Sequence, residues 1–469
     1  MAFSALRETP GIKRINRFLA SPGYVLAVAL LSLLSSAFSL EMPVYTLFIL
    51  VALYTCLLGD DLLPVMPLVV LCYIAPSAVN NPGRNGDSIF DPKHGGLYLV
   101  ALVAALAVGV VFFLVKDRCR NFKKLFTCSR KLLFGMVLLW VAYMLSGLGS
   151  PAYPEYLKKN LFFGFVQGAS VAVPYIVFAA LVDWDKARKD YFAWLSVGVG
   201  LSLLGQFLWI YATEPVIQDG VIDRNLIYTG WGMYNNMGSL LAMMIPFPFY
   251  LGMAHKKGWL GALAGTVFLG GVFLSNSRTS MLAGAAVYGL CVLIQFFTTA
   301  NKKRTVIALV AAAVLGIAGL VVLREKIFSL FEDILSRGFS LNHRDEFYIA
   351  GVNQFVKYPV FGGSFYPIDY VPWDWSEVAS FSKFFPPRWH NTLIQLLACT
   401  GTVGLVTYLI HRLQTVRLFA AARNRENIFV ALSLLVLVFC SLFDCHFFNI
   451  GPTMFYSMAL AFAEKHKAE

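Results

Sequence analysis

Charged residues are scarce in this chain. Only 14% of its 469 residues are Asp, Glu, Lys or Arg, whereas soluble domains carry about a quarter. Because so few ionic groups could not cover the surface of a soluble protein of this length, an ordinary cytosolic protein is excluded. Apolar residues are abundant instead: 58% are hydrophobic and 15% aromatic. Uncharged runs of about 20 residues recur, which is the length that a helix needs to cross a hydrocarbon layer. The sequence therefore predicts an all-α polytopic membrane protein.

Apolar segments without Asp, Glu, Lys or Arg follow one another along the chain, and we expect about 12–14 transmembrane helices from them. The fourteen segments are 23–40, 42–58, 62–79, 97–115, 132–149, 161–182, 191–213, 231–254, 258–274, 281–299, 305–323, 390–410, 428–443 and 450–463.

Lys and Arg are distributed unevenly between alternate connecting segments. With the N-terminus in the cytoplasm, the inside segments collect 25 Lys and Arg and the outside segments collect 13. Seven of these 13 lie in one long segment, to which the positive-inside rule does not apply. The asymmetry predicts that both termini are cytoplasmic. It also explains the net charge of +12 without nucleic acid as a partner.

The long segment, 324–389, is predicted to form a structured external cap. A helix is expected at 326–339, lying in the membrane interface. A second helix is expected to start at Asn342 as its N-cap and to end before Pro359. The rest of the segment is rich in aromatic residues. We therefore predict three parts: an N-terminal transmembrane bundle (1–323), the external cap (324–389) and the C-terminal transmembrane helices (390–469).

The sequence does not indicate metal or thiol chemistry. The eight cysteines show no CxxC spacing, and the seven histidines form no HExxH motif. The DxD-like sequence Asp183-Trp184-Asp185 falls on the predicted cytoplasmic side among cations. We therefore expect no disulfide scaffold, no metal site and no cofactor.

Four motifs that combine cations with small polar residues face the predicted outer compartment. They span 223–241, 275–280, 343–365 and 388–404, and their candidate site residues are Arg224, Asn236, Arg278, Arg344, Arg388, His390 and Asn391.

In these motifs the sequence resembles the O-antigen ligase and polymerase superfamily, which are integral membrane glycosyltransferases of the bacterial envelope. An Arg between small hydroxyl residues is matched by Ser277-Arg278-Thr279. The other family features, which cover roughly the second half of the chain in the same order, are matched by Arg224, Gly230 and Asn236, by Arg344, Pro359, Phe361, Gly362, Gly363 and Ser364, and by His390, Asn391, Gly401 and Gly404.

The resemblance implies a GT-C-like fold and a metal-independent, inverting transfer. A glycan would pass from an undecaprenyl-diphosphate-linked donor to a hydroxyl of a glycan or lipid-glycan acceptor. The reaction would take place at the outer, periplasmic side of the bacterial cytoplasmic membrane, among its lipids. Without a metal, fixed cations must stabilise the leaving diphosphate. Arginine forks suit phosphate, so Arg278 and Arg344 are the expected catalytic cations and Arg224 a third.

His390 is the expected general base, because a neutral imidazole can accept the proton of an acceptor hydroxyl. Asn391, Asp345 or Glu346 would orient its ring. Substrate contacts are expected from Arg224, Asn236, Arg388 and Asn391.

Structural roles remain as alternatives for these residues. Arg278 could anchor lipid head groups, Arg344 could pair with a local acid, and His390 could be a histidine that only marks a span boundary. His343 and His446 are alternative bases.

Two other functions also remain open, a repeat-unit polymerase of the same superfamily and a polysaccharide or lipid transporter. Transporters usually place ionisable residues inside the membrane, and none of the fourteen segments contains Asp, Glu, Lys or Arg.

Overall fold

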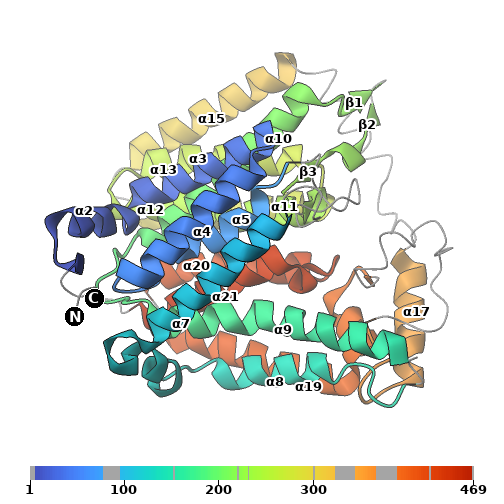
Figure 1. The fold of residues 1–469 in the computed structure, drawn as a ribbon. Coiled ribbons are helices and arrows are strands. Elements are labelled where there is room, and N and C mark those ends of the chain that lie inside the picture. Colours follow the sequence, from blue (N-terminus) through green and yellow to red (C-terminus); the bar gives the residue numbers. More distant parts are fainter. Residues whose placement is uncertain are drawn as a thin grey trace.

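The computed structural model describes residues 6–77, 96–150, 154–218, 221–230, 232–298, 302–322, 344–365, 388–421 and 424–466, and these residues are mostly helical (Figure 1). The helices are α2 (Pro10–Leu19), α3 (Pro22–Phe38), α4 (Glu41–Leu58), α5 (Val65–Ile74), α7 (Gly96–Thr127), α8 (Leu133–Met144), α9 (Pro154–Leu181), α10 (Tyr191–Thr213), α11 (Tyr234–Met244), α12 (Pro246–Ala254), α13 (Gly258–Leu274), α14 (Arg278–Thr298), α15 (Lys302–Val322), α17 (Arg344–Lys357), α19 (Thr392–Ala421), α20 (Arg425–Cys440) and α21 (Ile450–Lys465).

Short elements connect some of these helices. The 3-10 helices are η2 (Arg224–Leu226) and η3 (His446–Phe448). Strand β1 (Ile217–Gln218) pairs antiparallel with β2 (Val221–Ile222), and β3 (Tyr228–Thr229) pairs antiparallel with β4 (Gly232–Met233). The hairpins and α17 lie at the end of the bundle away from both chain termini (Figure 1).

Each predicted apolar segment coincides with a helix, and 231–254 coincides with the pair α11 and α12. The all-α polytopic fold is therefore confirmed. Among the described residues, six helices are long and apolar enough to cross a membrane, or up to eight if each of two bent pairs counts as one span. Others are short: α5 has 10 residues and α8 has 12. The number of about 12–14 spans stays a prediction.

Glycine allows close packing of α8 against α9. A Cβ atom added at Gly164 would lie 2.3 Å from the carbonyl oxygen of Tyr143, and one added at Gly168 would lie 2.0 Å from the Trp140 ring. Small residues four positions apart on one helix face let two membrane helices approach closely. This pair of helices packs between α19 and α21, which carry or flank the candidate site.

Helix α19 is broken at Gly401, where φ is 62° and ψ is −158°. The turn after α17 packs into this break. The Gly363 N–H donates to the Ala398 carbonyl (2.8 Å), and the Thr402 N–H donates to the Pro359 carbonyl (2.8 Å). A Cβ atom at Gly401 would lie 2.4 Å from the carbonyl oxygen of Val360. Gly362, Gly363 and Gly401 therefore have a structural role, because they let the turn after α17 pack against α19.

Of the predicted external cap, the second helix is present as α17, while its N-cap Asn342 and the helix predicted at 326–339 lie outside the described residues. Most of the aromatic part of the cap, 366–387, also lies outside them. The division of the chain into three parts stays a prediction.

Helix α19 continues beyond residue 410, where hydropathy places its end, to Ala421. Arg412 therefore lies within the helix and not in a loop. Its guanidinium lies over the rings of Phe447 (4.4 Å), Tyr408 (4.7 Å) and Tyr456 (5.1 Å), and Nη1 donates to the Tyr456 hydroxyl (3.1 Å). The absence of cations that holds for the predicted segments thus does not hold for α19 itself. Hydropathy alone therefore no longer argues against a transporter.

Candidate active site around His390 and Asp444

His390 lies just before α19 and is held by contacts on both sides. The neighbouring Trp389 is 1% exposed, and its N–H donates to Oε1 of Gln395 (2.9 Å). From α17, the Phe347 ring meets the His390 ring edge-on at 5.4 Å, and the Tyr348 hydroxyl donates to the His390 carbonyl (3.2 Å). The backbone φ of His390 is 49°, a left-handed conformation that costs energy for a residue with a side chain.

Asp444, in the loop between α20 and α21, faces the His390 ring. Its Oδ1 lies 3.4 Å from Nδ1 of His390 and accepts a hydrogen bond from the N–H of Cys445 (2.7 Å). Its Oδ2 accepts one from Nδ2 of Asn235 (3.3 Å), on α11. A carboxylate beside Nδ1 favours the tautomer that carries its proton there. This leaves Nε2 as the proton acceptor of the ring.

Two residues of this loop, Asp444 and His446, have shifted pKa values. Burial by itself would raise the pKa of Asp444, but the contact with the His390 ring and the positive charge of Arg344 hold this pKa well below its usual value. Burial lowers the pKa of His446 to about 4, helped by Arg388, Arg344 and His390 and opposed by Asp444. At neutral pH the loop therefore presents an ionised Asp444 and a neutral His446, whose Nδ1 lies 3.3 Å from the Ser239 hydroxyl.

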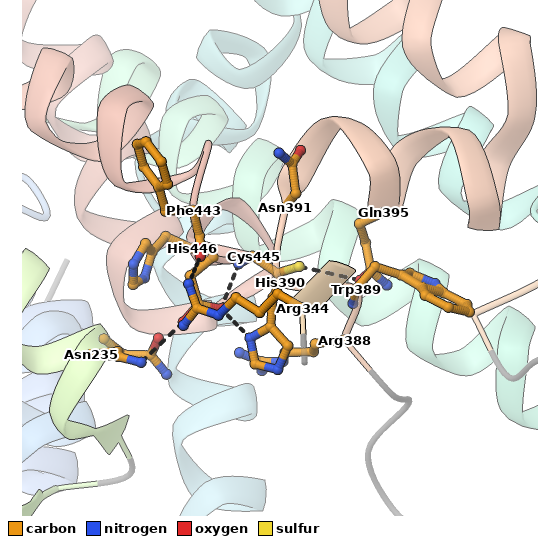
Figure 2. A network of polar contacts seen from close by, with 12 residues as sticks. Asn235, Arg344, Arg388, Trp389, His390, Asn391, Gln395, Phe443, Cys445 and His446 are labelled. Atoms are coloured by element: carbon orange, nitrogen blue, oxygen red, sulfur yellow. Dashed lines mark hydrogen bonds and ion pairs between the residues drawn. The ribbon is translucent and has the colours of Figure 1, made fainter. Parts of the chain in front are cut away.

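Two of the predicted arginines reach the ends of this loop. Arg344, the first residue of α17, donates to the carbonyl of Phe443 (Figure 2). Arg388 donates to Oδ1 of Asn449, whose Nδ2 in turn donates to Oδ1 of Asn236 (2.5 Å). Arg344 and Arg388 thus flank the His390 and Asp444 pair, and Asn236 is connected to it through Asn449.

The other two arginines lie on elements next to Asn235. Arg278 is half-buried at the start of α14, and two residues later the Ser280 hydroxyl donates to the Asn235 carbonyl (3.4 Å). Arg224, in η2, lies over the ring of Tyr234 at 5.3 Å. Both arginines therefore lie on elements that contact the start of α11, where the Asn235 side chain donates to Asp444.

The acid that lies next to the His390 ring, Asp444, is not one of the residues expected to orient it. Asn391 is used to cap α19: its Oδ1 accepts from the N–H groups of Leu393 (2.8 Å) and Ile394 (3.2 Å), and its Nδ2 donates to the Leu442 carbonyl (2.8 Å). Figure 2 shows the Asn391 side chain directed away from the His390 ring. Asp345 is exposed on α17. His343, an alternative base, lies outside the described residues.

Asp444 and Asn235 are the residues that sequence reasoning missed. One signal was available: Asp444 directly follows the apolar segment 428–443 and is the one acid of the short connection 444–449 on the predicted outer side. Nothing local linked it to His390, which precedes it by more than fifty residues.

Within the described residues, no group of three or more His, Cys, Asp or Glu side chains could hold a metal ion. A metal-independent reaction stays a prediction.

These features define an integral membrane protein with a histidine, an acid and arginines gathered at the bundle end opposite its termini. Residues 263–409, less than a third of the chain, match the family model described as O-Antigen ligase. This match supports the resemblance of the chain to the O-antigen ligase and polymerase superfamily that the sequence motifs indicate. Asp444 and His446 lie beyond the matched residues.

A curated relative supports the same assignment. The chain is similar to "Exopolysaccharide production protein ExoQ" from Rhizobium meliloti (strain 1021), with 26% identity over 186 residues. The matched region covers 37% of this chain and 41% of the relative, so the chain matches less than half of the relative's length.

Proposed function

We propose that this protein is a membrane glycosyltransferase of the O-antigen ligase type. It transfers a glycan from an undecaprenyl-diphosphate-linked donor to an acceptor hydroxyl at the outer face of the bacterial cytoplasmic membrane. The observation that carries the proposal is the contact between His390 and Asp444, flanked by Arg344 and Arg388. A base whose orientation is fixed, next to permanent cations, suits a reaction that deprotonates a hydroxyl and releases a phosphate anion.

In the proposed mechanism, Nε2 of His390 takes the proton of the acceptor hydroxyl as its oxygen attacks the anomeric carbon of the donor. The bond from that carbon to the diphosphate oxygen breaks, and its electron pair stays with the lipid diphosphate. One displacement inverts the anomeric centre. Asp444 stabilises the imidazolium that forms, and the proton is then released to solvent.

The arginines have the second role in this mechanism. Negative charge grows on the leaving diphosphate, and guanidinium groups stay charged and can bind two phosphate oxygens at once. Arg344 and Arg388 bind the two ends of the loop that carries Asp444, at Phe443 and Asn449. Arg278, at the start of α14, and Arg224, in η2, are proposed to contact the same diphosphate from these neighbouring elements.

The test uses purified full-length protein in lipid nanodiscs with a lipid-diphosphate-linked repeat unit. Glycan transfer by the wild type and its loss in His390→Ala, with an unchanged elution profile and helical content, support the proposal. Transfer that persists in His390→Ala overturns the role of this histidine. Movement of the lipid-linked glycan across a vesicle membrane with no new glycosidic bond would instead make the protein a transporter.

The same assay separates the ligase from the polymerase. A ligase leaves the repeat units unchanged until a second acceptor is added, whereas a polymerase lengthens the carrier-linked chain by itself. The similarity to an exopolysaccharide production protein makes the polymerase the second candidate.

A further inference from the structure

Two short helices bend sharply away from the membrane spans. Helix α2 makes an angle of 65° with α3. In α7, the part Cys119–Thr127 makes an angle of 82° with Val100–Lys116, and Cys119 has a left-handed φ of 61° at the bend. An amphipathic helix that bends away from a span in this way can lie in the plane of the bilayer surface.

Both short helices are fixed to the same end of α4. From the α2 side, Arg7 donates to the carbonyl of Leu57 (3.5 Å) and Asn16 to that of Leu58 (3.2 Å). From the bend in α7, Lys116 donates to the carbonyls of Cys56 (2.9 Å) and Gly59 (2.8 Å). The last carbonyls of a helix lack intrahelical partners and attract cations. The two short helices therefore lie at the same end of the bundle, where Figure 1 places α2 and both termini.

The outward surfaces of these two helices combine aromatic groups with cations. Phe18 is 51% exposed, Phe122 47% and Phe126 72%. Beside them, Lys13, Arg14, Arg17, Arg120 and Lys123 are exposed. Residues 119–127 contain no acid, and Glu8, which pairs with Lys13, is the one acid in residues 6–20. The opposite sides are covered: Leu19 and Asn121 are buried.

We infer that α2 and residues 119–127 together bind the head groups of anionic phospholipids. The aromatic rings would enter the boundary between head groups and acyl chains, and the cations would contact lipid phosphates. The excess of cations over acids requires an anionic partner, and the exposed rings at the same level require an apolar layer. An anionic bilayer surface offers both, whereas a soluble anion offers only the first. The charge asymmetry of the sequence predicts that this leaflet is the cytoplasmic one.

The inference does not depend on the proposed glycosyltransferase activity, and its test measures lipid binding. Full-length protein in neutral detergent is titrated with phosphatidylglycerol, and bound lipid is counted by native mass spectrometry. The variant Arg14→Gln, Arg17→Gln, Lys123→Gln is compared with the matched control Lys302→Gln, Lys303→Gln, Arg304→Gln, which removes three exposed cations from the start of α15. Each cation near an anionic surface strengthens binding about fivefold, so the first variant should bind about a hundredfold more weakly and the control like the wild type.

Two further measurements decide what the surface binds. In Phe126→Trp, the new indole should be quenched by brominated lipid in nanodiscs and protected from aqueous iodide. Equal loss of phosphatidylglycerol binding in both triple variants, or an indole that only iodide quenches, overturns the inference. So does stabilisation by inorganic phosphate in phosphatidylcholine nanodiscs equal to that by phosphatidylglycerol, since the surface would then serve a soluble anion.

Discussion

Oδ1 of Asp444 lies 3.4 Å from Nδ1 of His390, although the two residues come from opposite ends of α19 and α20. The His390 side chain is 35% exposed and that of Asp444 only 11%. The imidazole can therefore meet a substrate on one side, while the acid is shielded behind it. This is the arrangement expected of a base and the group that orients it.

The first prediction concerns this acid. Asp444→Asn should lower the rate of glycan transfer about a hundredfold or more, because the amide can favour the wrong tautomer and cannot stabilise the imidazolium. The comparison is Asp345→Asn, on exposed α17, which should retain the wild-type rate. Transfer rates in nanodiscs at equal protein amounts measure both. A loss of activity in Asp345→Asn together with full activity in Asp444→Asn would instead assign the orienting role to Asp345.

Acid should destabilise the protein through His446. This buried imidazole has a pKa of about 4 against an ordinary value of 6.5, so between these pH values the unfolded chain binds more protons than the folded one. Stability should therefore fall as the pH drops from about 6.5 to 4, by up to about 3 kcal/mol. The thermal unfolding midpoint, followed against pH, should depend less on pH in His446→Gln. An identical pH dependence in wild type and variant would contradict this account.

Gly401 should be intolerant of a side chain. The backbone at φ 62° and ψ −158° is open essentially to glycine alone and costs Ala about 1–3 kcal/mol, and the Cβ of Ala would lie 2.4 Å from the carbonyl oxygen of Val360. Gly401→Ala should therefore destabilise the protein by about 2 kcal/mol or more. It should also reduce glycan transfer, because the turn after α17 could no longer pack against α19. The control is Gly289→Ala on α14, where the added Cβ meets no atom within 4 Å. If both variants lower the unfolding midpoint in detergent by the same amount, the structural role assigned to Gly401 is refuted.

Arg412 should stabilise the 3-10 helix that contains His446, next to the candidate site. Its guanidinium stacks on Phe447, in the 3-10 helix that contains His446, and such a contact is worth about 1–2 kcal/mol when shielded from water. Arg412→Met should therefore lower transfer about tenfold, with donor affinity unchanged, while Arg417→Met, on the exposed side of α19, should have no effect. Donor titrations give the two quantities separately. A weaker donor affinity at an unchanged turnover would place Arg412 in substrate binding instead.

The sequence by itself was sufficient to predict the helices and the family resemblance. Apolar segments such as 191–213 and 428–443 coincide with α10 and α20, because hydropathy is a property of consecutive residues. The arginine and histidine motifs led to the same superfamily that the family-model match over residues 263–409 supports. Sequence reasoning also singled out Arg344 and His390, which the packing of α17 on α19 brings to the same loop.

Only the tertiary structure decided which acid faces His390, what Asn391 does and where Arg412 lies. Asp444 reaches His390 because α20 packs beside α19, and no local pattern records a contact between residues so far apart in the chain. Asn391 looked like a ligand group, yet the unpaired N–H groups at the start of α19 use its oxygen. Arg412 was counted as a loop cation, because hydropathy ends a span at the first charge, whereas packed aromatic rings let the helix continue past it.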